Sequence, residues 1–501
     1  QVDGEVVYWL ETRPQQAGRT VLVSESPGGG RRDVNPPDTS VRSRVHEYGG
    51  GAYLAKAGRV WFIENRDQAI YTLGDDGEAV RLTDDATHRH ADMEWDDGRN
   101  RLVFVCESHA NDGPPGTFIA SIAADGIQRR VLEGHDFFSS PRISPDGARM
   151  AWLTWDHPHL PWDGSRLWVA ELDADGMPIT SVLIAGADDE SVGMPQWGPD
   201  GRLYFVSDRR DWWNLYAWDG ADTVEVVGMD AEIGLPHWVF GQSTYGFADE
   251  RTIIFAATGS GRWTLYRCDI STGAIEPEGF PCDAIEHVVA GGGKAYVLAG
   301  DSASAPAIYE CASGDSRRLV GSSEVEAPAQ WLSVPESIVF GTGQGESAHG
   351  LFYSPRNPDF EGCPGERPPI IVKCHGGPTG ATSTALDLRL HYWTSRGFAV
   401  LDLDYRGSTG YGREYRQSLY GRWGVADVED CVAAVRHLDE AGKVDGDRAL
   451  ISGGSAGGYT VLCALTFTDG FRAGASYYGI GDLESMFATT HKFEARYDHW
   501  L

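Results

Sequence analysis

Ser455 is the residue in this chain best placed to act as a nucleophile. It lies in the glycine-rich run Gly453-Gly454-Ser455-Ala456-Gly457-Gly458, directly after the apolar strand pattern of residues 449–451 and before a helical stretch. A serine at a tight strand-to-helix turn projects its hydroxyl out of the sheet, and the flanking glycines allow the neighbouring backbone to approach closely. The spacing therefore predicts a nucleophile elbow and a serine hydrolase.

A second motif could stabilise the negative charge that nucleophilic attack creates. His375-Gly376-Gly377-Pro378 follows the apolar strand pattern of residues 370–373. A His-Gly-Gly turn at this position directs a backbone N–H at the scissile carbonyl, and the residue after the serine supplies the other donor. We therefore expect the amides of Gly377 and Ala456 to form an oxyanion hole. The alternative is a plain Gly-Pro turn with a structural histidine. His375 itself is predicted to be structural, because it precedes the serine instead of following it.

Elements that alternate between strand and helix should position both motifs. From residue 370 onward, strand patterns at 370–373, 398–403 and 449–451 are separated by helical segments, the clearest of which spans 425–438 with apolar residues on one side. Such alternation is typical of a parallel sheet. Residues 326–501 are therefore predicted to form an α/β-hydrolase domain, with two further strands and a Pro/Gly-rich connection before residue 370.

The first 325 residues have a different character, with short β-type runs broken by Asp-Gly and Gly-rich turns. Three copies of a strand, an Asp-Gly turn and an apolar strand place Gly98, Gly147 and Gly201 at spacings of 49 and 54 residues. These spacings are close to the period of propeller blades, about 40–50 residues. Residues 1–325 are predicted to form a β-propeller of about seven blades, with a pair of β-sandwiches as the alternative.

Composition excludes several classes of function. The net charge is −31, with 73 acidic against 42 basic residues, and a field of this sign repels nucleic acids and anionic lipid surfaces. The eight cysteines contain no C-x-x-C pair and no histidine spacing of the zinc type, which favours reduced thiols in the cytoplasm and no bound metal. No apolar run reaches the roughly 18 residues needed to span a bilayer. No organic cofactor is expected either.

Taken together, the motifs resemble the prolyl oligopeptidase family of serine peptidases, and within it the branch of acylaminoacyl-peptidases and dipeptidyl-aminopeptidases. The resemblance rests on 375–378, 404–412 and 453–458 behind an N-terminal propeller, and extends to propeller segments at 47–51 and 155–164. It implies a seven-bladed propeller that caps the hydrolase, with the active site between the two domains. It also implies amide hydrolysis through an acyl-enzyme, acting on short peptides or aminoacyl amides. One bacterial aminopeptidase of the family hydrolyses puromycin, and this chain is similar to that type.

The same resemblance places part of an apolar specificity pocket near Tyr478, Phe487 and Phe493, although each of these could equally be an ordinary core aromatic. A homo-oligomer is compatible with it. Arg406 could face either the cavity or a structural carboxylate.

The chain departs from the family pattern after the serine. The acid and the histidine of the triad should follow Ser455, yet only His491 and His499 do so among the histidines, and neither has the usual arrangement. We therefore expect the triad acid and histidine to lie beyond residue 501, and the hydrolase domain to be incomplete in this sequence. Two other functions stay open: an esterase or lipase that uses the same elbow, and a non-enzymatic propeller scaffold with a degenerate hydrolase domain.

Overall fold

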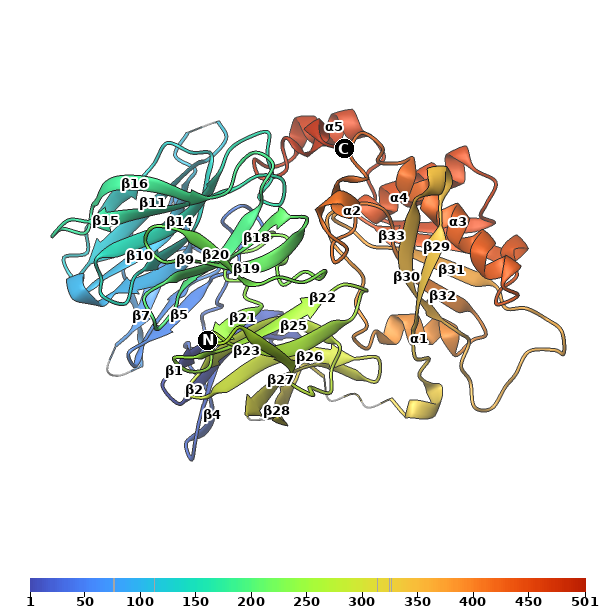
Figure 1. Ribbon diagram of the computed structural model, residues 1–501, viewed down its shortest axis with the longest axis horizontal. Coiled ribbons are helices and arrows are strands. Elements are labelled where there is room, and N and C mark those ends of the chain that lie inside the picture. The colour runs from blue at the N-terminus through green and yellow to red at the C-terminus, as the bar shows by residue number, and fades with distance from the viewer. Residues whose placement is uncertain (75–76, 112, 313, 324, 326) are drawn as a thin grey trace.

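The computed structural model describes residues 1–74, 77–111, 113–312, 314–323, 325 and 327–501. An all-β body carries the N-terminus, and a body of strands and helices carries the C-terminus (Figure 1). The predicted start of the second domain, residue 326, lies outside the described residues.

Within the described residues, the N-terminal body consists of seven four-stranded antiparallel sheets, and the strands of each sheet follow one another along the chain. The first three sheets contain β1 (Val2–Asp3), β2 (Val6–Arg13), β3 (Arg19–Ser26), β4 (Gly30–Asp33); β5 (Tyr53–Lys56), β6 (Arg59–Ile63), β7 (Ile70–Leu73), β8 (Ala79–Arg81); and β9 (His88–Asp96), β10 (Arg101–Ser108), β11 (Gly116–Ala123), β12 (Gln128–Leu132). The next two contain β13 (Phe137–Ile143), β14 (Arg149–Trp155), β15 (Arg166–Leu172), β16 (Pro178–Ala185); and β17 (Val192–Trp197), β18 (Leu203–Arg210), β19 (Trp212–Trp218), β20 (Thr223–Val227). The last two contain β21 (Tyr245–Phe247), β22 (Thr252–Thr258), β23 (Trp263–Asp269), β24 (Ala274–Pro277); and β25 (Ala284–Gly291), β26 (Lys294–Asp301), β27 (Ser304–Ala312), β28 (Asp315–Gly321).

The sheets are the blades of a closed ring, which confirms the predicted propeller. Val7 and Trp9 of the first blade pack in one buried cluster with Tyr296 of the seventh, so the two ends of the ring meet. Apolar clusters also join neighbouring blades, as where Trp61 of the second blade stacks on Trp95 of the third with ring centroids 4.8 Å apart. The sandwich alternative is therefore wrong, because each blade packs its faces against two neighbours.

The Asp-Gly repeats lie where the sequence places them, between the first and second strands of a blade. Gly147 and Gly201 adopt positive φ angles of 70° and 78° in these turns, a conformation that favours glycine. Gly98 differs, because it sits in a short 3-10 turn and Asn100 takes the left-handed position instead, with φ 48°. Asn tolerates this conformation better than most residues do.

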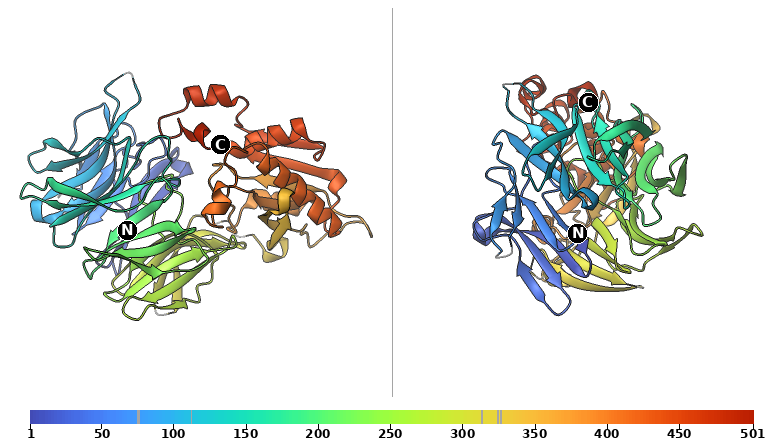
Figure 2. Two further views of the ribbon diagram at one scale, coloured as in Figure 1. Left: turned by 45° about the horizontal axis from the view of Figure 1, so that its top comes forward. Right: turned by 90° about the vertical axis from the view of Figure 1, so that its left-hand side faces the viewer.

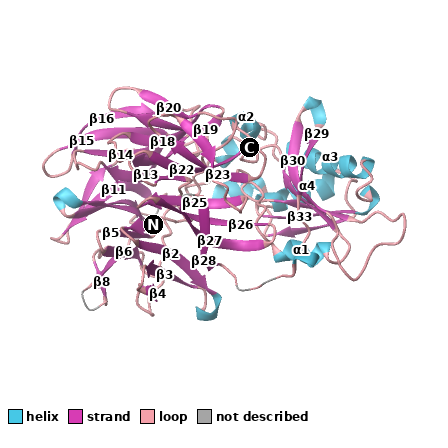
Figure 3. Cartoon of the chain, turned by 60° about the horizontal axis from the view of Figure 1, so that its bottom comes forward, coloured by secondary structure: helices cyan, strands magenta, loops and turns pink. Residues whose placement is uncertain are grey.

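The C-terminal body is built on one six-stranded sheet with the strand order β29-β30-β32-β31-β33-β34. Its strands are β29 (Glu336–Gly341), β30 (Ser347–Tyr353), β31 (Ile370–Cys374), β32 (Ala399–Asp404), β33 (Ala449–Gly454) and β34 (Ala473–Tyr477). The last four are parallel, whereas β29 and β30 pair antiparallel. The helices are α1 (Leu388–Thr394), α2 (Arg413–Gln417), α3 (Ala426–Glu440), α4 (Ala456–Phe467) and α5 (Leu483–Thr489), and they are confined to this half of the molecule apart from short turns (Figure 3).

Helices cover both faces of this sheet. Helices α3 and α4 pack on one face in the largest apolar cluster, and α1 packs on the other through Leu390. The predicted helix at 425–438 matches α3, with Val428, Val435 and Leu438 buried as its spacing indicates. Val425 is 54% exposed, because it precedes the first helical residue and so leaves the apolar stripe.

Two further features bear on the sequence predictions. In the part of the chain that the structure describes, no helix has the length and apolar character needed to cross a membrane. All eight cysteines are free thiols; Cys363 is exposed, and the other seven are buried.

Candidate active site

The two glycine-rich motifs follow adjacent parallel strands. Strands β31 and β33 pair in a register that sets Cys374 opposite Gly453, so the turns that begin at His375 and Gly454 leave the same edge of the sheet side by side. A methyl group added to Gly376 would lie 3.5 Å from the Ser455 Cβ. Ligands of α/β proteins bind at this carboxyl edge of the strands.

Ser455 has an unusual backbone conformation for a residue other than glycine. Its φ is 54° and its ψ −122°, at the residue that precedes the first turn of α4. Such a conformation costs about 1–3 kcal/mol and persists only where the surrounding structure imposes it. The side chain is exposed, and its hydroxyl makes no hydrogen bond within the described residues. The turn therefore presents the hydroxyl to solvent at the edge of the sheet.

Close backbone approach holds this turn in place. A Cβ at Gly457 would lie 2.3 Å from the Cys374 carbonyl oxygen and 2.6 Å from that of His375. At Gly453 it would lie 2.4 Å from the carbonyl oxygen of Gly457. Only glycine fits at both positions, so the first turn of α4 can pack directly on the strand that leads into the second motif.

Two backbone amides beside Ser455 lack acceptors. Neither the Gly377 N–H nor the Ala456 N–H donates a hydrogen bond to any described group. Ala456 is the first residue of α4, where an amide has no partner inside the helix and the positive end of the helix dipole adds to its field. Gly377 has a φ of 127°, which favours glycine. The arrangement can therefore receive a negatively charged oxygen.

His375 is held away from Ser455 by its own contacts. Its Nε2 lies 2.7 Å from the Ser408 hydroxyl, and its Nδ1 lies 2.8 Å from the Gly376 carbonyl oxygen. The imidazole stacks on the Tyr405 ring with centroids 4.4 Å apart. Both ring nitrogens of His375 are therefore occupied by these hydrogen bonds, which stabilise the turn that carries the Gly377 amide.

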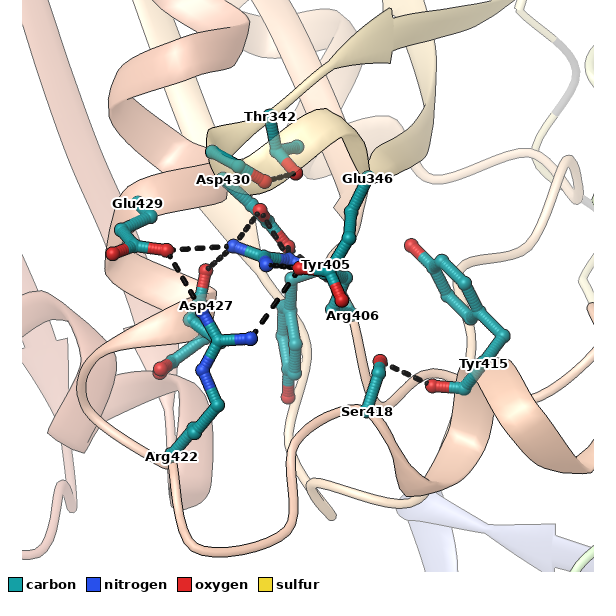
Figure 4. A network of polar contacts seen from close by, with 12 residues as sticks. Thr342, Glu346, Tyr405, Arg406, Tyr415, Ser418, Arg422, Asp427, Glu429 and Asp430 are labelled. Carbon is teal, nitrogen blue, oxygen red and sulfur yellow. Dashed lines mark hydrogen bonds and ion pairs between the residues drawn. The ribbon is translucent and has the colours of Figure 1, made fainter.

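Arg406 faces structural carboxylates and not the cavity, which settles the choice that its sequence context leaves open. The side chain is 1% exposed; its Nε donates to Asp430 at 2.8 Å, and one terminal nitrogen donates to Glu429 at 2.9 Å (Figure 4). Glu346 accepts from the other terminal nitrogen and also pairs with Arg422 at 3.3 Å. This network anchors the segment after β32 to α3.

The same segment after β32 also makes hydrogen bonds and ion pairs with the propeller. Glu232, buried in the propeller, accepts from the amides of Gly410 and Gly412 at 3.1 Å each. Asp208, also buried, accepts from Arg413 at 2.7 Å and from Arg416 at 2.5 Å. Glu232 gave no signal in the sequence, because one acid among 73 is indistinguishable without knowledge of its distant partners.

A cavity of about 550 Å³ lies between the two domains. Propeller residues including Glu232, Trp238 and Trp263 line one side, and the hydrolase segment 380–383 lines the other. That segment continues directly from the His375–Pro378 turn. The lining includes neither Ser455 nor the residues Gly377 and Ala456, so the cavity lies beside the second motif and not over the serine.

The predicted pocket aromatics do not gather in one place. Phe493 is 1% exposed and packs against propeller rings, among them Trp155, Trp162 and Trp238, with Phe487 at the border of this cluster. Figure 2 shows the C-terminal segment reaching from the hydrolase body to the propeller. Tyr478 is 86% exposed, and its ring lies over Gly454. Of the three, Tyr478 is the one beside the Ser455 turn.

The two histidines that follow Ser455 in the sequence lie in this C-terminal segment. His491 Nε2 is 3.6 Å from Glu494, and the His499 ring contacts Trp500. Neither ring makes a hydrogen bond to Ser455. Among the described residues, no histidine contacts the serine hydroxyl.

Comparisons with known proteins agree with this architecture. The model of the prolyl oligopeptidase family matches residues 384–501. The structure of a puromycin-hydrolyzing peptidase from Mycobacterium tuberculosis superposes with a TM-score of 0.94 at 34% identity, covering 100% of this chain and 80% of that one. Dipeptidyl aminopeptidase BIII of Pseudoxanthomonas mexicana is 33% identical over 130 residues, which is 26% of this chain and 19% of the relative.

Dipeptidyl-peptidase 5 of Porphyromonas gingivalis is 25% identical over 368 residues, or 72% of this chain and 45% of the relative. The chain thus spans less than half the length of these curated relatives.

Proposed function

Because this chain belongs to the prolyl oligopeptidase family of serine peptidases, we propose that it hydrolyses amide bonds of short peptides or aminoacyl compounds through an acyl-enzyme. The observation that carries the proposal is the placement of the strained Ser455 turn against the His375–Pro378 turn, with two amides free to bind an oxyanion.

In this mechanism the Ser455 Oγ attacks the carbonyl carbon of the scissile bond and loses its proton to a general base. The carbonyl oxygen becomes negative and accepts hydrogen bonds from the amides of Gly377 and Ala456. The protonated base then gives this proton to the leaving nitrogen, so that collapse of the tetrahedral intermediate releases the amine and leaves an ester on Ser455, which water then hydrolyses. Among the described residues, no side chain makes a hydrogen bond with the Ser455 hydroxyl, and both ring nitrogens of His375 are engaged elsewhere.

The cavity between the domains supports small substrates. Its volume of about 550 Å³ suits a few residues and excludes a folded protein. The mycobacterial structure is described as a puromycin-hydrolyzing peptidase, and we propose hydrolysis of puromycin and similar aminoacyl amides for the present chain, as in an aminopeptidase. Tyr478 is the proposed pocket residue closest to the chemistry, because its ring covers Gly454; Phe487 and Phe493 would act only through the domain contact.

We also propose a reducing, cytoplasmic location, supported by the eight free thiols, and no nucleic-acid or membrane partner, supported by the net charge of −31. A homo-oligomer is compatible with these features.

The proposal is tested with the natural full-length polypeptide that contains residues 1–501. We expect a fluorophosphonate probe to modify Ser455, as located by peptide mapping, and Ser455→Ala to lower kcat/KM for puromycin and aminoacyl amides by at least about 10⁴-fold. Ser485→Ala, at an exposed serine of α5, is the matched control and should keep both activities.

Turnover of esters without amides would favour the esterase alternative. Absence of labelling and turnover in the folded wild-type protein would favour the scaffold. Full amide hydrolysis by Ser455→Ala would contradict the assignment of the nucleophile.

A further inference from the structure

The third blade of the propeller carries a cluster of metal-ligating side chains remote from the Ser455 turn. His88 and His90 lie two residues apart on β9, so they share a face, and Cys106 on β10 pairs directly with His90. One ligand atom from each of the three lies within 4.8 Å of the other two. Strands β9 and β10 are labelled in Figure 1.

The hydrogen bonds of His90 leave one nitrogen with a lone pair directed into the cluster. Its Nδ1 lies 2.7 Å from the Gln68 carbonyl oxygen, which can only accept, so Nδ1 carries the hydrogen. In the neutral ring Nε2 then has no hydrogen, and its lone pair faces the cluster. A metal-ligating histidine is oriented in the same way, by the hydrogen bond that its other nitrogen makes.

The amide of Gln128, on β12, lies among the three groups. Its Nε2 is 3.3 Å from His88 Nδ1 and 3.7 Å from Cys106 Sγ, so both of these atoms receive a donor. Its Oε1 faces His90 Nε2 at 3.4 Å, and there two lone pairs oppose each other. One amide nitrogen cannot donate to all three atoms at once. A cation would satisfy them all.

Charges of both signs lie near the cluster, because the Phe118 ring that carries Arg130 also contacts His88. The Asp85 carboxylate lies 3.5 Å from His88 Nδ1. Arg130, which follows Gln128 on β12, is turned onto the Phe118 ring at 4.1 Å and pairs with Glu133 at 2.6 Å. The His88 side chain is 15% exposed, which provides a path for an ion from solvent.

We propose that His88, His90 and Cys106 form a binding site for a borderline-soft divalent cation such as Zn²⁺, with the Gln128 oxygen or a water as the fourth ligand. Two nitrogens and one thiolate are the donor set that tetrahedral Zn²⁺ prefers. Zn–N and Zn–S bonds of about 2.1 and 2.3 Å place ligand atoms roughly 3.4–3.6 Å apart, so the three groups must close by about 1 Å. The partly exposed His88 ring can supply that movement.

Binding requires Cys106 as a thiolate. A cysteine thiol is ordinarily protonated at neutral pH. When Zn²⁺ forms its bond to sulfur, this proton is released to solvent, and affinity therefore rises with pH. The bound ion would tie β9 to β10 within one blade and act separately from the proposed peptidase site.

The experiment uses the intact protein, dialysed free of metal and titrated with Zn²⁺ against a chromophoric chelator. We expect one Zn²⁺ per chain with a thermal unfolding midpoint raised by Zn²⁺, and at least a roughly 100-fold weaker affinity for Cys106→Ser. Co²⁺ should give a thiolate charge-transfer band that Cys106→Ser lacks. Cys268→Ser, at a buried strand cysteine of the sixth blade, is the matched control and should bind as the wild type does.

Because Cys106 is fully buried, its replacement could unfold the blade. His88→Gln, at the partly exposed ligand, is therefore the second variant and should also lose affinity. Zn²⁺ binding that is equal in the wild type, His88→Gln and Cys268→Ser, or no binding by the folded wild type, would overturn the proposal and leave Gln128 as a hydrogen-bonding bridge.

Discussion

The propeller and the hydrolase domain differ in how far apart in the sequence their paired strands lie. Each blade pairs strands that are neighbours in the sequence, such as β13 to β16. The hydrolase sheet instead pairs β31 with β33, two strands that begin 79 residues apart in the sequence, at residues 370 and 449. The His375 and Ser455 turns converge where these distant strands meet. In the hydrolase domain, pairing between strands distant in the sequence thus brings two motifs together, whereas pairing within a blade joins neighbouring segments.

The two domains also contribute different groups to their contact. In the network around the 404–416 segment of the hydrolase, the propeller supplies buried acids, Asp208 and Glu232, and the hydrolase supplies arginines and backbone amides. The buried acids of the propeller therefore obtain these hydrogen-bond donors from the hydrolase domain. The following predictions test this division of roles.

The largest effect is expected for Arg416→Ala. The Arg416 side chain is fully buried, lies 2.5 Å from Asp208 and 3.6 Å from Glu232, and stacks on Trp213 at 4.0 Å. Its removal leaves two buried carboxylates without this cation, which typically costs about 3–5 kcal/mol of unfolding free energy. Urea unfolding followed by tryptophan fluorescence measures the loss.

Arg389→Ala is the control, since the Arg389 side chain is 90% exposed and its loss should change stability by less than about 0.5 kcal/mol. Equal unfolding free energies of the two variants would show that Asp208 and Glu232 are not stabilised by the arginine of the hydrolase domain.

A smaller effect is expected for Gly457→Ala. The added methyl would collide with two backbone oxygens of the neighbouring turn, so we expect a loss of about 1–3 kcal/mol together with slower fluorophosphonate labelling of Ser455. Gly116→Ala, in the propeller, is the matched change, because a methyl group added there would have no atom within 4 Å. Calorimetry and labelling rates should distinguish Gly457→Ala from Gly116→Ala. Equal stabilities and labelling rates of the two variants would mean that close packing does not constrain the Ser455 turn.

The smallest effect concerns pH. Burial raises the pKa of the Glu232 carboxyl to about 7 from its usual 4.5. The folded state then binds this proton more tightly than the unfolded state, so the contribution to stability is present below pH 4.5 and is lost as pH rises toward 7. The net shift, which already includes the opposing effects of the amides and Arg416, corresponds to at most about 3 kcal/mol; relaxation around a buried carboxyl reduces this, so we expect about 1 kcal/mol.

Glu232→Gln removes the titrating group. Its urea midpoint should therefore fall less than that of the wild type between pH 4.5 and 7, and parallel midpoints would contradict the shift.

Much of this architecture could be predicted from the sequence because its signals are local. The blades follow from turns within a few residues of their strands, and the Ser455 and His375 motifs are each contiguous. The contact of Glu232 with Gly410 was not predictable, because it joins residues 178 positions apart without any local pattern. Phe493 illustrates the same limit: an aromatic residue in a polar stretch does not reveal which domain will bury it.

The reactivity of the cysteines can be used to follow unfolding of the chain. One thiol, Cys363, is open to solvent, and the other seven are shielded, among them Cys374 and Cys431 with their sulfurs 3.5 Å apart. A thiol-reactive dye should therefore count one equivalent on the native protein and eight on the denatured one. Since cysteines occur in both domains, the order in which the hidden equivalents become reactive during partial denaturation would identify which domain opens first.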